Sequence, residues 1–188
     1  TVCKSVLSQA CGGVLGAAKA IRKPNAKKPL VALSSLGKTA LKYMVYLKPE
    51  LEKRGYELIV FHTTGQGGRA LEWLAKRGRF VAVLDFSLQE VVNDLFKSVV
   101  TSGSNRLVRA GEIGIPQIIA PGSINIIDLP TWQKPIKKLK NRPRHVHNRL
   151  ISSVTLSGKE LQKAAKNISD KVSNAKGPVK FILPKKGV

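Results

Sequence analysis

The stretch YELIVFHTTGQGGRALEWL, residues 56–74, decides the fold. Its first part, up to Phe61, is apolar enough to predict a strand that is buried on both faces. An amphipathic run begins at Arg69, and the polar turn between the two contains the glycines Gly65, Gly67 and Gly68. Strand, glycine-rich turn and helix start is the order in which backbone N–H groups converge on an anion. The spacing matches neither the full GxGxxG motif nor a P-loop. The turn can therefore be interpreted in two ways, as an anion-binding turn or as a tight turn without a ligand.

Strand-length apolar runs alternate with helix-periodic runs outward from this stretch. Strands are expected at residues 30–36, 56–61, 80–86, 116–120 and 178–183, and helices at 39–54, 68–76, 88–98, 106–112 and 159–175. Such alternation predicts an α/β fold, namely a three-layer Rossmann-like domain with a mainly parallel sheet of about five strands. The proline-rich, basic residues 128–144 are expected to form a long loop, and Ser157 is expected to cap the last helix.

The chain divides into residues 1–27, a small-residue-rich helix with a basic linker, and residues 28–188, the Rossmann-like domain. Because it begins at Thr1 without a methionine, we expect it to be cut from a longer polypeptide. Cys3 and Cys11 lie eight residues apart in the first helix, too far for a disulfide. They are interpreted as reduced core cysteines of a cytoplasmic protein. No apolar stretch reaches the ~18–20 residues that span a membrane, so no membrane partner is expected.

Polar residues gather where the predicted strands end. Right-handed crossovers place all strand-to-helix loops of a parallel sheet at one edge. Polar groups that converge on one edge favour a ligand site there, although each alone is also ordinary turn chemistry. The candidate ligand-binding residues are Lys38, Thr39, His62, Thr64, Gly65, Gly67, Gly68, Arg69, Asp85, Gly122, Ser123, Asn125, His147 and Asn148.

Several of these residues have two interpretations. His62 suits a general base or phosphate partner, and equally a histidine that bonds its own turn. Asp85 could hold a metal, a ribose hydroxyl or a lysine, or cap the helix that follows, and Ser87 with Glu90 has the spacing of a capping box. Lys38 follows a glycine as at the end of a phosphate loop, but the earlier glycine is missing. Neither zinc-ligand spacing nor a nucleophile-elbow motif occurs, so we expect no metal site and assign no catalytic residue.

The chain is strongly basic, with 33 Lys+Arg against 11 Asp+Glu and a formal net charge of +22. An excess of positive charge attracts nucleic acid or an acidic protein. Basic residues spread over solvated helix faces would explain the same excess without any partner. One stretch without any acidic residue contains Lys134, Lys137, Lys138, Lys140, Arg142, Arg144 and Arg149. It has no aromatic residue after Trp132, so base stacking gains no support.

Four motifs carry a family resemblance: FHTTGQGGRALE (residues 61–72), IPQIIAPGSIN (115–125), VHN (146–148) and GPVKFILPKKGV (177–188). With them, nearly the whole chain resembles the second domain of the tomato mosaic virus resistance protein-like ATP-binding family. The chain departs from that family's pattern at Asn125, where an aspartate is usual, and at Arg149, where a proline and then an arginine–threonine pair are usual. At these positions the chain has an amide in place of a carboxylate and lacks an arginine that could bind an anion.

The resemblance implies two Rossmann-like domains with a cleft between them, and ATP bound mainly by a first domain that is absent here, with Mg²⁺ as a candidate ion. Together with the residues above, it predicts a domain that completes a cleft for a nucleotide or phosphorylated metabolite. The alternative is a basic module that binds nucleic acid or an acidic protein. An N-terminal domain is expected as a partner, and the protein is expected to form a homo-oligomer.

Overall fold

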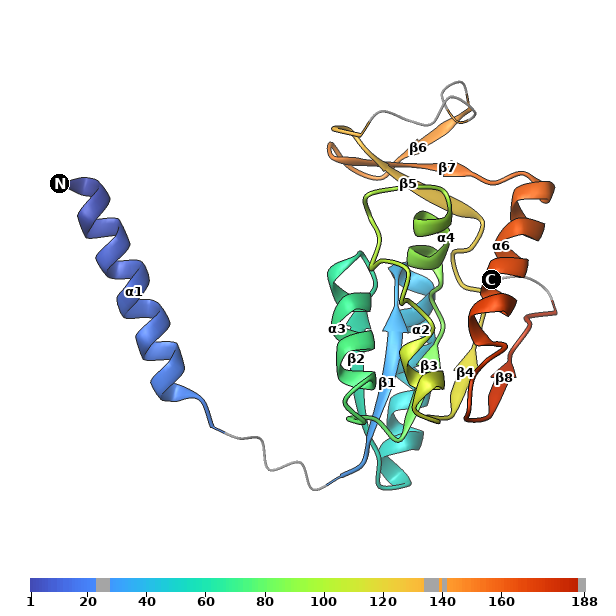
Figure 1. The fold of residues 1–188 in the computed structure, drawn as a ribbon, viewed down its shortest axis with the longest axis horizontal. Coiled ribbons are helices and arrows are strands. Elements are labelled where there is room, and N and C mark those ends of the chain that lie inside the picture. Colours follow the sequence, from blue (N-terminus) through green and yellow to red (C-terminus); the bar gives the residue numbers. More distant parts are fainter. Residues whose placement is uncertain (23–27, 134–138, 140–141, 186–188) are drawn as a thin grey trace.

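A computed structural model describes residues 1–22, 28–133, 139 and 142–185. Its centre is a five-stranded, fully parallel sheet in the order β2-β1-β3-β4-β8. The strands are β1 Leu30–Ser35, β2 Glu57–His62, β3 Ala82–Asp85, β4 Gln117–Ile119 and β8 Val179–Phe181. The predicted α/β fold with a mainly parallel five-stranded sheet is therefore confirmed (Figure 1).

Helices cover both faces of this sheet. They are α2 Gly37–Lys53, α3 Gln66–Ala75, α4 Gln89–Leu95, α5 Arg109–Glu112 and α6 Gly158–Val172. Side chains alternate along β1, so Val31 and Leu33 pack in the α2 layer while Ala32 packs with Leu71 of α3. The chain runs from β1 through α2 to β2, then returns past β1 through α3 to β3. This reversal puts the topological switch point between β1 and β3.

A second, antiparallel sheet has the order β5-β7-β6, with β5 Ile126–Pro130, β6 Arg144–Val146 and β7 Ile151–Thr155. Ile127, Leu129 and Val154 pack from it onto α4 and α6. The prediction of a long loop over 128–144 is thus wrong at both ends. Burial of alternate residues in β5 stabilises a strand there, and Pro130 is tolerated because β5 is an edge strand. Of the basic stretch, residues 134–138 and 140–141 lie outside the described residues.

The first helix forms as predicted, as α1 Val2–Ala20, but none of its residues is buried. Cys3 and Cys11 are free, yet they are exposed, so the interpretation as core cysteines is wrong for this structure. At the other end of the chain, Ser157 is the N-cap of α6 as predicted, and its N–H donates to Glu160 at 2.8 Å. Within the part of the chain that the structure describes, no helix has both the length and the apolar character that a membrane crossing needs.

Candidate functional site

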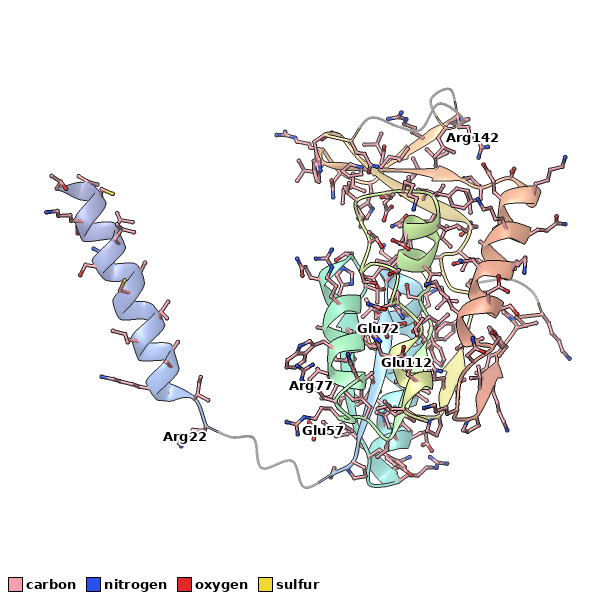
Figure 2. The ribbon with its side chains drawn as sticks, viewed as in Figure 1. Arg22, Glu57, Glu72, Arg77, Glu112 and Arg142 are labelled. Atoms are coloured by element: carbon pink, nitrogen blue, oxygen red, sulfur yellow. The ribbon has the colours of Figure 1, made fainter. Side chains whose placement is uncertain are left out.

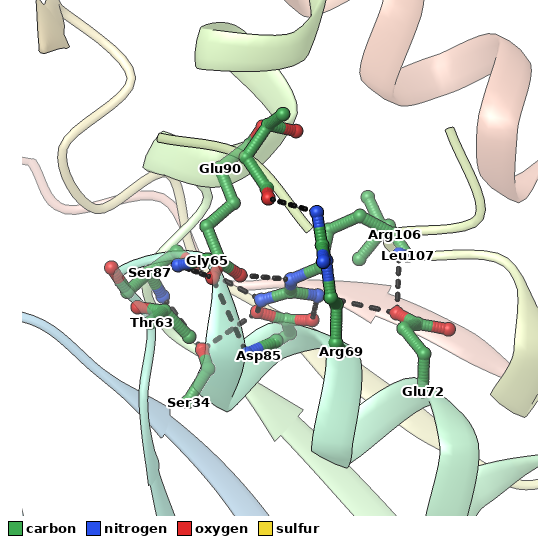
Figure 3. Close-up of polar contacts among 12 residues, drawn as sticks. Ser34, Thr63, Gly65, Arg69, Glu72, Asp85, Ser87, Glu90, Arg106 and Leu107 are labelled. Carbon is green, nitrogen blue, oxygen red and sulfur yellow. Dashed lines mark hydrogen bonds and ion pairs between the residues drawn. The ribbon is translucent and has the colours of Figure 1, made fainter. Parts of the chain in front are cut away.

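A buried cluster of charges lies below the carboxyl edge of the parallel sheet, around Arg106 (Figure 3). The Arg106 side chain is fully buried, and its Nη2 donates to Asp85 Oδ1 at 2.7 Å while Nη1 pairs with Asp85 Oδ2. Its Nε donates to Glu90 at 2.8 Å, and Nη1 lies 3.5 Å from Glu72. Carboxylates from α3, β3 and α4 thus meet on a single cation.

The surroundings shift the proton affinities of this cluster. Burial disfavours the Arg106 cation, but attraction to Asp85, Glu72 and Glu90 outweighs burial and raises the pKa of Arg106. Burial also raises the pKa of Glu72 above its usual range, and contacts with Arg106 and two backbone N–H groups offset this only in part. Figure 2 shows Glu72 pointing into the body, whereas Arg77, five residues later, lies at the surface. The cluster is a structural feature whose disruption would leave buried charge unpaired.

The glycine-rich turn faces an anion that belongs to the protein itself. The N–H groups of Gly65 and Gly68 donate to Glu90 Oε1, at 2.5 and 3.3 Å. A Cβ atom added at Gly68 would lie 1.8 Å from Glu90 Oε2, and one at Gly67 would lie 1.9 Å from the carbonyl oxygen of His62. Glycine is therefore required at these two positions by the internal carboxylate and by the close approach of backbone.

The predicted capping box of Ser87 and Glu90 is wrong. Helix α4 begins after Leu88 and has no side-chain cap, and Glu90 points inward to Arg106 and the glycine-rich turn. The Glu90 carboxylate pairs with Arg106 rather than capping α4, because an unpaired buried guanidinium costs far more free energy than an uncapped helix end.

Asp85 ends β3 as predicted, but it bonds Arg106 and accepts a hydrogen bond from Ser34 Oγ at 2.6 Å. Ser34 Oγ in turn accepts the N–H of Ser87 at 2.9 Å. These bonds fix the β3–α4 loop against the end of β1. Sequence reasoning gave no role to Glu72 and Arg106, since a single buried residue of either type leaves no local pattern in a sequence.

The other predicted residues are distributed over several surfaces. His62, Thr64 and Arg69 are exposed around the glycine-rich turn, and Lys38 is exposed at the start of α2, where Thr39 also lies. His147 and Asn148 belong to the turn between β6 and β7, in which Asn148 Oδ1 accepts the N–H groups of Leu150 and Ile151 at 2.8 and 2.9 Å. Among the described residues, no group of three or more His, Cys, Asp or Glu could hold a metal ion.

A pocket of about 910 Å³ opens at the carboxyl edge on the α2 side. Its walls come from the loop after β1, from α2, from the loops after β3 and β4, and from the segment after β8. It includes three of the predicted residues, Gly122, Ser123 and Asn125. Much of its wall is aromatic or aliphatic, and the rings of Tyr43 and Phe86 meet edge to face with centroids 6.3 Å apart.

The start of α2 borders this pocket, since both Leu36 and Ala40 line it. The helix has no side-chain cap and no acidic residue in its first turn. Its first N–H groups therefore carry the uncompensated positive end of a 17-residue helix toward the pocket.

The opposite wall is a tightly held loop. A Cβ atom at Gly122 would lie 2.1 Å from the carbonyl oxygen of Phe86, and the N–H of Leu88 donates to the Gly122 carbonyl at 2.9 Å. Ser123 has a φ of 59°, a left-handed conformation that is unfavourable for serine. Backbone strain of this kind gathers at functional sites.

These features define a class: a Rossmann-like α/β domain with an open pocket at the switch point of its sheet, where folds of this class bind ligands. The family described as "Uncharacterised protein family (UPF0261) C-terminal domain" matches residues 28–188. The chain therefore belongs to the UPF0261 family.

Relatives agree with this assignment. The chain is 54% identical over 187 residues to a UPF0261 protein of Brucella melitensis, an alignment that covers 100% of this chain and 45% of the relative. A UPF0261 protein of Clostridium tetani is 33% identical over 190 residues, with 100% and 46% covered. The ToMV resistance protein Tm-1 of Solanum lycopersicum is 33% identical over 142 residues, with 76% and 19% covered. The resemblance to the tomato protein is thus real but distant, and the chain spans less than half the length of the bacterial relatives.

Proposed function

We propose that this domain binds a nucleotide or another phosphorylated metabolite in the pocket beside α2, and that it forms one wall of a larger cleft. The observation that carries the proposal is the pocket itself, which has a volume of about 910 Å³ and lies at the switch point of the sheet. Ligand pockets of proteins typically measure ~300–1,000 Å³, and α/β sheets bind ligands at this position.

The phosphate would lie at the start of α2. There the N–H groups of the first turn and the exposed side chain of Lys38 offer positive charge. This position is preferred to the glycine-rich turn because Glu90 already accepts the N–H groups of Gly65 and Gly68. A ligand anion at that turn would have to displace a fully buried carboxylate that also pairs with Arg106.

The rest of the ligand would follow the pocket wall away from α2. Tyr43, Phe86 and Ile182 offer aromatic and aliphatic surface to a base, while Ser123 and Asn125 offer hydrogen-bonding groups. Asn125 is exposed and neutral, so it suits an uncharged edge of a base or a sugar hydroxyl better than a metal ion.

ATP with Mg²⁺ is the first ligand to test, because the sequence resembles an ATP-binding family. The relatives are more than twice as long as this chain, and the domain that they carry beyond it would supply the second wall. Sharing of a ligand between two domains agrees with the openness of the pocket toward solvent and with its location at a sheet edge.

Thermal unfolding at fixed, moderate salt tests the proposal, with ATP–Mg²⁺, adenosine monophosphate and inorganic phosphate as ligands. A ligand that binds only the native state raises the midpoint by mass action. We expect a larger rise with a nucleotide than with phosphate, a smaller one in Tyr43→Ala and Lys38→Gln, and an unchanged one in the control Lys166→Gln, which alters a surface pair on α6. Equal midpoints with and without every ligand, in the chain and in the two-domain protein, would refute the proposal.

The basic surface favours a second candidate function, binding of a polyanion. No acidic residue occurs between Asp128 and Glu160, and Arg144, His145 and Val146 are all exposed on the edge strand β6. Arg142 is less available to a polyanion, since it already donates two hydrogen bonds to Glu160 at 2.6 and 2.9 Å. Binding of nucleic acid through many phosphate contacts would weaken by orders of magnitude between low and moderate salt, whereas a ligand held in the pocket would respond far less.

A further inference from the structure

Helix α1 presents an apolar surface that no described residue covers. Its 19 residues are all exposed, among them Val2 at 83%, Val14 at 69% and Leu7 at 60%. Helices in proteins owe most of their stability to packing of an apolar face rather than to intrinsic propensity. An exposed helix of this composition therefore indicates a partner.

Most apolar side chains of α1 lie on one face, and Leu15 is the large apolar exception. At about 100° per residue, one half of the helix surface carries Val2, Cys3, Val6, Leu7, Ala10, Cys11, Val14 and Ala17. The opposite half carries Lys4, Ser5, Ser8, Gln9 and Lys19, together with Gly12, Gly16 and Leu15. A face this wide is typical of a helix that packs on the core of a domain, because a two-stranded coiled coil needs only a narrow seam.

Three glycines interrupt α1, and of these Gly13 lies on the apolar half. Gly12, Gly13 and Gly16 lie in the middle of the helix, where each destabilises it by roughly 0.5–1 kcal/mol relative to alanine. A Cβ atom at any of them would meet nothing within 4 Å. The close approach of another backbone to the apolar half would account for Gly13, whereas Gly12 and Gly16 lie on the opposite half and do not bear on this contact.

The position of α1 identifies the partner. The match to the C-terminal domain begins at residue 28, so α1 lies outside that domain. The alignments with the relatives nevertheless include α1, since they cover the whole chain, and the chain makes up only 45–46% of those proteins. Because the matching domain is described as C-terminal, the remainder of those proteins is expected to precede α1.

We propose that α1 docks through its apolar half onto the N-terminal half that proteins of this family carry, and so joins the two halves. A partner on the same polypeptide is present at an effective concentration in the millimolar range, which favours it over a second copy of the chain. This inference does not depend on the proposed ligand, because α1 contributes no residue to the pocket.

The two cysteines test this contact directly. They are the only cysteines of the chain, and both lie on the apolar half of α1. We would measure the rate of thiol modification in the full two-domain protein and in the same protein unfolded in urea. We expect both thiols to react at least about tenfold more slowly in the native protein, at a rate that is independent of protein concentration.

A matched variant controls for general accessibility. In a Cys3→Ser, Cys11→Ser background, Ser8→Cys moves the thiol of α1 to the polar half, where we expect rapid modification. Val6→Asp should abolish the protection of Cys3 and Cys11, whereas Ser5→Asp on the polar half should leave it unchanged. Rapid modification of Cys3 and Cys11 in the unaltered protein would overturn the proposal. Protection that increases with protein concentration would also overturn it, since a second copy would then cover the face.

Discussion

Glu90 Oε1 accepts the N–H of Gly65 at 2.5 Å, although the two residues are 25 positions apart in the chain. The glycine-rich turn thereby receives its negative charge from α4. The same carboxylate binds Arg106, so the turn, α4 and the loop that leads to α5 form one hydrogen-bonded unit. This contact explains how a turn can have the appearance of a phosphate-binding loop while serving the fold.

Glu90→Gln should destabilise the protein by about 3–5 kcal/mol, the cost of breaking a buried ion pair. The amide has nearly the same shape, but it leaves Arg106 with less compensation and cannot accept all three present bonds. Urea unfolding gives the difference in free energy. Glu112→Gln is the control, because it removes a solvent-exposed pair with Arg109 and should change stability by less than ~1 kcal/mol. Equal effects of the two changes would contradict the structural role of Glu90.

Gly67→Ala should reduce stability by well over ~1 kcal/mol, because the new methyl group would lie 1.9 Å from the carbonyl oxygen of His62. The backbone of the turn would have to move, and the contact of Glu90 with Gly65 and Gly68 would move with it. Gly158→Ala at the start of α6 is the matched change, since a Cβ atom there meets nothing within 4 Å. We expect that change to be neutral or slightly stabilising in thermal unfolding. If Gly67→Ala were also neutral, the turn would not have the described geometry.

Arg142 should support stability in mild acid. Its hydrogen bonds, with those of Ser157, lower the pKa of Glu160 to about 2, below that of an unfolded chain. A depressed pKa contributes stability that is fully present above the unfolded value near ~4.3 and is lost as pH falls through about 2. Glu160→Gln should therefore lower stability at pH 6 and flatten its dependence on pH in this window. Parallel pH profiles for the two proteins in urea titrations would count against the pair.

Ser123→Gly should separate stability from binding. Glycine adopts the φ of 59° without strain, so the free energy of unfolding should rise by up to ~1 kcal/mol. Loss of the hydroxyl should at the same time weaken binding of the proposed ligand, which calorimetric titration with ATP–Mg²⁺ would measure. Lys97→Gly is the matched control, since Lys97 has a φ of 61° and does not line the pocket. Equal affinities in all three proteins would remove Ser123 from the site.

The parallel sheet was predictable because its signal is local. Runs such as residues 30–36 and 56–61 are mostly apolar, and each is followed by a helix-periodic run; this order is typical of βα units. The second sheet was not predictable in this way. Strand β5 contains Asp128 and ends in Pro130, and its partner β7 lies more than twenty residues further along. Its strand character comes from tertiary burial of Ile127 and Leu129 rather than from composition.

The candidate site also has a part that the sequence indicated and a part that depends on contacts between distant residues. The sequence indicated the edge at which the pocket lies, because the loops after parallel strands must meet there, and it indicated Gly122, Ser123 and Asn125. It could not show that Glu90 fills the glycine-rich turn. That contact depends on Arg106, whose three carboxylate partners are 16, 21 and 34 positions away, and such pairings leave no periodic trace in a sequence.

The Arg106 cluster also has a consequence for how this protein can change over time. Replacing Arg106 alone leaves three carboxyl groups buried together, and replacing Asp85 alone removes its main counter-charge. Each single replacement is expected to lower the free energy of unfolding, whereas a joint replacement by well-packed apolar side chains need not. Divergence at these positions is therefore expected to proceed by coupled substitutions, because the cluster disfavours the replacement of one of its residues at a time.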